Sequence, residues 1–168
     1  MKQLTVILIL LMFLVGCSSD IEQAGPAKES TVTQEENRED DFISATIESS
    51  EELQQTTENL KPLLNDLDVM NSTWQTNVYD LAEDITWSLN GYALATSYLS
   101  EDQHENKYAD TIEIYEQGRS ELITISDDLH TSLDTYDKKL FSDICKRLDP
   151  AMQKIDEAIK HLEEERYE

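Results

Sequence analysis

Apolar residues recur at helical spacing over most of the chain from Phe42 onward. They fall mainly at steps of three and four in successive series that begin at Ile43, Trp74, Tyr108 and Leu140. Alternation with a period of two residues, which marks half-buried strands, is absent over any useful length. The pattern therefore predicts an all-α domain over residues 42–168, with helices near 42–70, 72–99, 103–135 and 138–166.

Two arrangements are compatible with these helices. One is an antiparallel bundle of three to four long helices joined by short connections. The other is a long two-helix hairpin that turns near residues 100–104, because the apolar phase is almost unbroken on either side of that point. Several apolar residues widen the stripes beyond a two-stranded seam, which favours the bundle. These residues are Trp87, Leu94, Tyr98, Ile114 and Ile123.

Local signals refine the helix boundaries. Pro150 is expected to kink or divide the last helix. Ser72–Gln75 and Ser100–Gln103 both match a capping box, in which a serine and a glutamine three residues later bond reciprocally at a helix start. Gly91 and Gly118 fall within strong apolar series. We therefore interpret them as tolerated helical glycines that cost about 1 kcal/mol each.

The first residues form a separate unit. Leu4 to Val15 is an apolar run interrupted only by Thr5, and as a helix it would reach about 18 Å, short of the roughly 30 Å bilayer core. A signal peptide explains this run better than a membrane span does. The residues at the end of this run, Leu14-Val15-Gly16-Cys17, resemble the lipobox of bacterial lipoproteins at all four positions.

This resemblance implies both export and processing. Residues 1–16 would be a lipoprotein signal peptide, cut off between Gly16 and Cys17, and Cys17 would be the lipid attachment site. The protein is then expected at the cell membrane, lipid-anchored on its extracytoplasmic face. Residues 17–41 would be the lipidated N-terminus and a disordered tether, because this stretch is polar, acidic and almost free of large apolar residues.

The charge balance limits the possible partners. The chain has 36 Asp and Glu against 13 Lys and Arg, a formal net charge of -23. Such a negative field argues against binding to nucleic acid and favours a protein partner with a basic surface. The chain also lacks the sequence motifs of nucleophilic catalysis and of phosphate binding. We therefore expect no enzyme activity, no catalytic residues and no cofactor.

Two residue patterns remain as candidate sites. Each histidine has an acidic residue three or four positions before it, in the pairs Glu101–His104, Asp127–His130 and Glu157–His161. Such pairs also occur on ordinary exposed helices, so we assign no metal ligands, and a metal- or cation-binding bundle is the alternative function. Aromatic residues concentrate in the second helix, where they are either core residues or a contact face for a partner. They are Trp74, Tyr79, Trp87, Tyr92 and Tyr98.

The leading functional expectation is a non-catalytic binding or scaffold module for another envelope component, held at the membrane through Cys17. The remaining cysteine, Cys145, has Phe141, Ile144 and Leu148 within one helical turn. We therefore expect it to be a small buried core residue rather than a reactive thiol.

Overall fold

The computed structural model describes residues 29–165, and within this range the chain is helical with no strand. Four long helices account for most of it: α2 (Glu29–Asn65), α3 (Ser72–Thr96), α4 (Ala109–Thr135) and α5 (Lys138–Glu165). A single π-helical turn, η2 (Gln103–Lys107), precedes α4. The predicted all-α class is confirmed. The predicted signal peptide, Cys17 and the first part of the predicted tether lie outside the described residues.

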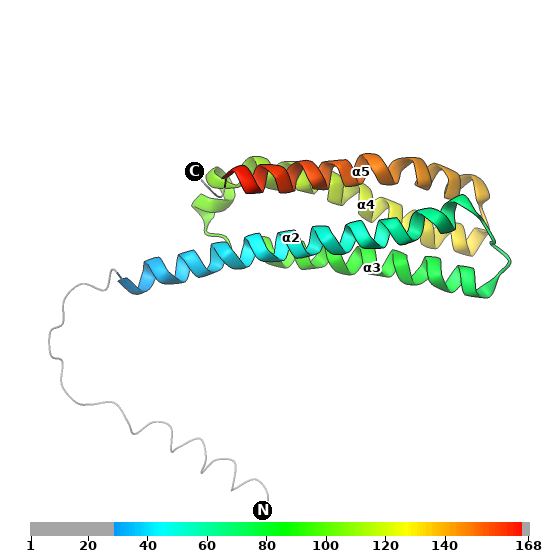
Figure 1. Cartoon of the computed structure of the whole chain (residues 1–168), viewed down its shortest axis with the longest axis horizontal. Coiled ribbons are helices and arrows are strands. Elements are labelled where there is room, and N and C mark those ends of the chain that lie inside the picture. The colour runs from blue at the N-terminus through cyan, green and yellow to red at the C-terminus, as the bar shows by residue number, and fades with distance from the viewer. Residues whose placement is uncertain (1–28, 166–168) are drawn as a thin grey trace, which may run out of the picture.

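The four long helices form an up-and-down antiparallel bundle (Figure 1). Each packs against two others, so that α2 contacts α3 and α5, and α4 contacts the same two helices. The two-helix hairpin is therefore wrong. Short connections reverse the chain after Asn65 and after Thr135, which allows four separate stripes to face one core.

The core is built from the predicted apolar series, with fully buried aromatic residues at both ends. At one end Phe42 of α2 packs on Tyr108, with ring centroids 5.2 Å apart. At the other end Trp74 of α3 meets Phe141 of α5 edge to face at 5.2 Å. The Trp74 indole N–H also donates to the backbone oxygen of Leu63, at 3.0 Å. These contacts join helices that are distant in sequence.

A polar layer crosses the core near the end formed by Phe42 and Tyr108. Ser49 Oγ of α2 donates to the backbone oxygen of Ser88 at 2.6 Å and lies 3.0 Å from Tyr115 Oη of α4. The ring of Tyr92 stacks on that of Tyr115 with centroids 3.6 Å apart. Burial raises the pKa of Tyr115 to about 12 and also raises the pKa of Tyr92. Within the described residues, Tyr92 Oη is buried without a hydrogen-bond partner.

Helix α2 starts earlier than the sequence predicted. The helix begins at Glu29 rather than near 42, so residues 29–41, which we expected to belong to a disordered tether, are helical. No glycine or proline lies between Glu29 and Asp41, so a helix nucleated by the buried residues Phe42 and Ile43 can extend back through them. The first turns of α2 project beyond the ends of the other helices (Figure 1).

The caps and breakers agree with the sequence in part. The Ser100–Gln103 capping box is confirmed, because Ser100 N donates to Gln103 Oε1 at 3.0 Å and Gln103 N donates to Ser100 Oγ at 3.3 Å. The predicted capping box at Ser72–Gln75 is wrong. Asn71 caps α3 instead, accepting from the backbone N–H groups of Thr73 and Trp74. Helix α5 runs through Pro150 undivided.

Gly118 lets α4 and α5 approach closely. A Cβ atom built on it would lie 2.9 Å from the backbone oxygen of Ala151 and 2.9 Å from Cδ1 of Ile155. Distances below 3.0 Å are not tolerated without movement, and the atom facing Gly118 is backbone. The glycine at this position is thus required by the packing of the two helices.

Candidate protein-interaction face on helix α3

The exposed large apolar side chains of the bundle gather mainly on α3 and the turn after it. Trp87 is 72% exposed, Leu94 60% and Tyr98 37%. Because Leu94 follows Trp87 by seven positions, both lie on the same side of α3, with Gly91 between them, and Tyr98 lies in the turn just after the helix ends at Thr96. We call Trp87, Gly91, Leu94 and Tyr98 the α3 stripe.

The other aromatic residues of the predicted contact face have different positions. Trp74 and Tyr92 are buried in the core at 5% and 0% exposure. Tyr79 is exposed but packs edge to face on His130 of α4, with centroids 4.9 Å apart, away from the stripe. The predicted face is thus divided: Trp74 and Tyr92 stabilise the fold, whereas Trp87 and Tyr98 are exposed on the surface.

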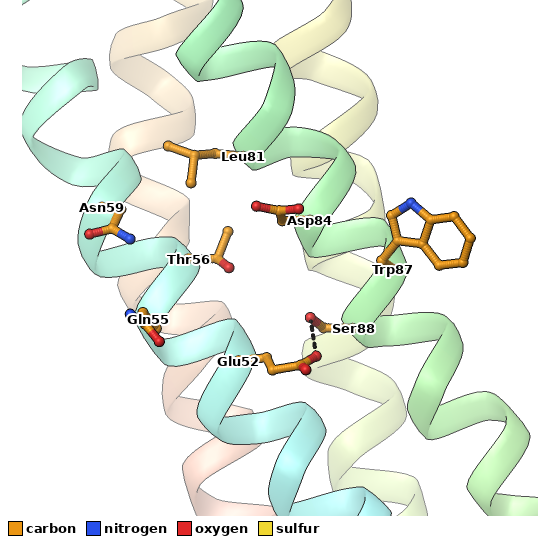
Figure 2. Close-up of a pocket in the computed structure, with 8 residues that line it drawn as sticks. All are labelled: Glu52, Gln55, Thr56, Asn59, Leu81, Asp84, Trp87 and Ser88. Carbon is orange, nitrogen blue, oxygen red and sulfur yellow. Dashed lines mark hydrogen bonds between the residues drawn. The ribbon is translucent and has the colours of Figure 1, made fainter.

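A groove of about 420 Å³ runs between α2 and α3 beside Trp87. Figure 2 shows the carboxylates of Glu52 and Asp84 in the space between the two helices, whereas the Trp87 ring projects outward from α3. Ser88 Oγ donates to Glu52 Oε2 at 3.0 Å, which holds one carboxylate in the groove. The lining residues are Glu52, Gln55, Thr56, Asn59, Leu81, Asp84, Trp87 and Ser88.

The charge of α3 itself is one-sided. Helix α3 contains Asp80, Glu83 and Asp84 but no lysine or arginine. Most basic residues of the bundle lie on the α4–α5 half, where carboxylates pair with several of them. Arg147, for example, bonds Glu121 and Asp128 at 2.5 Å each. The α3 stripe therefore offers apolar contact area within a negative field.

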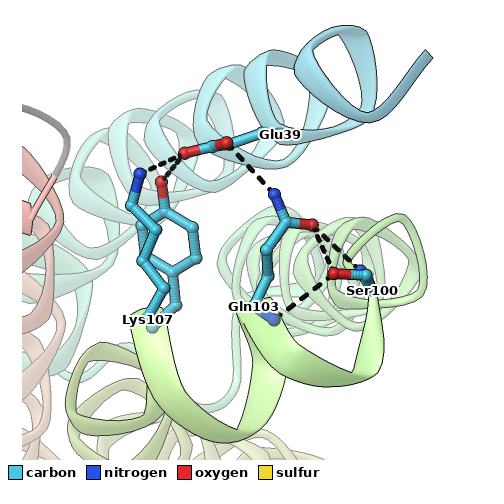
Figure 3. A network of polar contacts seen from close by, with 5 residues as sticks. Glu39, Ser100, Gln103 and Lys107 are labelled. Carbon is cyan, nitrogen blue, oxygen red and sulfur yellow. Dashed lines mark hydrogen bonds and ion pairs between the residues drawn. The ribbon is translucent and has the colours of Figure 1, made fainter. Parts of the chain in front are cut away.

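A second polar cluster joins α2 to the π-helical turn (Figure 3). Glu39 Oε1 accepts from Lys107 Nζ at 2.7 Å and from Tyr108 Oη, and Glu39 Oε2 accepts from Gln103 Nε2 at 3.1 Å. Partial burial would raise the pKa of Glu39. The hydrogen bonds from Lys107, Tyr108 and Gln103 and the Lys107 charge outweigh that effect and lower the pKa. This cluster, which holds α2 against η2, was not predicted from the sequence.

Among the described residues, the three predicted His–carboxylate pairs do not come together in one cluster. His104 is exposed on η2, and His161 is half-buried near the end of α5. His130 Nε2 lies 3.3 Å from Glu83 Oε1 of α3, a residue outside the pairs noted in the sequence. Among residues 29–165, no three His, Cys, Asp or Glu side chains form a group suited to a metal ion. The geometry therefore gives the metal-binding alternative no specific support.

The cysteines differ in what the structure describes. Cys17 lies outside the described residues. Cys145 is half-buried rather than fully buried as expected, because it sits at the edge of the α2–α5 contact, where its Sγ lies 3.6 Å from Asn65 Oδ1. Within residues 29–165 no helix is both long enough and apolar enough to cross a bilayer.

The chain was compared with protein-family models, with curated proteins and with solved structures, and none of the three comparisons gave a match. The α3 stripe and its acidic surroundings are therefore the features on which a functional proposal rests.

Proposed function

We propose that this protein is a lipoprotein anchored through Cys17 to the extracytoplasmic face of the cell membrane, and that its bundle is a non-catalytic binding or scaffold module for another envelope protein. The anchor rests on the match of Leu14–Cys17 to a lipobox. The binding role rests on one observation above all: Trp87 and Leu94 project from the same side of α3, two turns apart, with most of their surface exposed.

The energetic argument favours a protein partner with a basic surface. Tryptophan and tyrosine are the residues most often found at the energetic centres of protein interfaces, where each can contribute about 2 kcal/mol or more. The stripe supplies one of each beside an aliphatic residue. Acidic groups at the edge of the stripe, among them Glu52 and Asp84, would attract a cationic partner and repel an anionic one.

Site-specific photocrosslinking in intact cells tests the binding role. A photoreactive phenylalanine is placed at Trp87, at Leu94 or, as a control, at Thr124, which is exposed on α4. We expect the first two positions to yield the same discrete adduct, with a partner segment rich in lysine or arginine, and the control to yield none. Equal labelling from all three positions, or no adduct from Trp87 and Leu94, contradicts the proposal.

The anchor is tested separately. Bacteria fed labelled palmitate should yield a labelled polypeptide that begins at Cys17, and a Cys17→Ala variant should remain unlabelled. An unlabelled wild-type protein that retains its initiator methionine removes the lipoprotein assignment without affecting the α3 stripe.

A further inference from the structure

The two helical glycines described in the structure have opposite surroundings. Gly118 is enclosed by α5, whereas nothing lies within 4 Å of a Cβ atom built on Gly91. Neither glycine has a positive φ, so neither is needed for its backbone conformation. Packing within the bundle therefore explains Gly118 and leaves Gly91 without an explanation.

A glycine within a helix has a cost. Relative to alanine it destabilises the helix by about 1 kcal/mol, because it loses more conformational freedom on folding. Gly91 lies within α3, exposed to solvent, at a position where an added Cβ atom would contact nothing. Nothing in the described fold offsets this cost.

The position of Gly91 on the helix suggests what offsets the cost of this glycine. It lies four residues after Trp87 and three before Leu94, so it forms a gap in the middle of the α3 stripe. A missing side chain between two large apolar ones lets another helix approach the backbone closely, as small residues do at tight helix crossings.

We infer that the partner docks on the α3 stripe as an amphipathic basic helix whose axis crosses α3 at Gly91. One apolar side chain of that helix would enter the gap between Trp87 and Leu94. Its lysine or arginine residues would face the carboxylates of Glu52 and Asp84 in the adjoining groove. This inference rests on the proposed binding role of α3.

Two observations favour a basic helix over a second copy of this chain. A second copy would bring another α3, which has acidic but no basic residues, against the first. It would also bring together two chains of net charge -23. The helical part of the stripe, from Trp87 to Leu94, extends about 10.5 Å, the length of two turns of a partner helix.

The experiment uses a synthetic helical peptide of about 20 residues, with leucine along one face and lysine elsewhere, long enough to cover the stripe. Its binding to the purified residue 17–168 chain is measured by fluorescence anisotropy at physiological salt. A second peptide has glutamate in place of every lysine. The protein variants are Gly91→Leu, Trp87→Ser and, as a matched control, Thr124→Leu on α4.

We expect the lysine peptide to bind and the glutamate peptide not to bind. Gly91→Leu should weaken binding about tenfold or more while leaving the bundle at least as stable as the wild type. Thr124→Leu should change neither property. If the stripe only required apolar area, Gly91→Leu would tighten binding, so the direction of the change distinguishes a helix crossing from simple hydrophobic contact.

Other results overturn the inference in distinguishable ways. If Trp87→Ser weakens binding and Gly91→Leu does not, the α3 face remains a docking site, but the partner helix does not cross α3 at Gly91. Binding unaffected by both variants, or no binding of the lysine peptide, would remove the docking face as well. A wild-type dimer in sedimentation equilibrium that Gly91→Leu abolishes would identify the occupant as a second copy.

Discussion

Replacing each helical glycine by alanine separates the requirement for close helix packing from the intrinsic cost of a helical glycine. At Gly118 the added methyl group would meet the backbone oxygen of Ala151 at 2.9 Å and Cδ1 of Ile155 at 2.9 Å. At Gly91 it would meet nothing within 4 Å. Both substitutions gain about 1 kcal/mol of helix propensity, so this gain cancels when the two variants are compared.

The expected magnitudes follow from these surroundings. Gly91→Ala should raise the free energy of unfolding by about 0.5–1 kcal/mol. Gly118→Ala forces the backbone of α5 to move away from α4, and such overpacking typically costs about 1–3 kcal/mol. We therefore expect Gly118→Ala to be less stable than Gly91→Ala by about 1–3 kcal/mol.

Urea unfolding followed by circular dichroism provides the measurement, provided that the dependence of the unfolding free energy on urea is the same in both variants. The wild type and an Asn90→Ala variant, which changes an exposed residue beside Gly91, serve as references. If the two glycine variants agree within about 0.5 kcal/mol, the close approach of α4 and α5 at Gly118 does not constrain the fold, and the reasoning is refuted.

Three further predictions follow from the structure. Glu39→Gln should lower the free energy of unfolding at neutral pH by about 1 kcal/mol. The folded-state pKa of Glu39 is lowered from its ordinary 4.5. The difference in unfolding free energy between the variant and the wild type should therefore persist above pH 4.5 and shrink as the pH falls through the lowered pKa. Urea titrations that show a constant difference down to strongly acidic pH would contradict this. Tyr115→Phe should destabilise the bundle by about 0.5–1.5 kcal/mol because Ser49 loses its hydrogen bond with Tyr115. By contrast, Tyr92→Phe removes a hydroxyl with no partner in the described part of the chain and should be neutral or stabilising. Equal losses of stability for the two variants would show that the Tyr92 hydroxyl is satisfied. The melting temperature of the wild type should rise between low and moderate NaCl, because screening reduces repulsion among the carboxylates, and a fall over that range would count against the electrostatic argument.

The buried stripes of the last three helices could be predicted from the sequence, but the outward face of α3 could not. Helix α3 has two apolar stripes, one through Val78, Ile85 and Leu89 and one through Trp87 and Leu94. Periodicity assigns both to the core. Only the first stripe faces the bundle, because the neighbouring helices cover one side of α3. Periodicity does not reveal which side of the helix is covered.

The early start of α2 and the π-helical turn depend on contacts between distant parts of the chain. The residues before Phe42 have no apolar period, so their sequence suggests disorder. In the fold Glu39 bonds Lys107 and Gln103 on η2, which attaches this polar segment to the bundle. The cap at Asn71 was missed for a local reason: asparagine and serine are both good caps, and Asn71 directly precedes Ser72.

The continuity of α2 has a mechanical consequence. Because the helix projects past the bundle and then lies along α3 and α5 over its remaining length (Figure 1), a pull on its N-terminal end acts parallel to its axis. Such tension loads the contacts of α2 in shear, all at once, instead of peeling them apart one by one. Force entering at Glu29 would thus be shared across the whole length of the helix before it reached anything bound to α3.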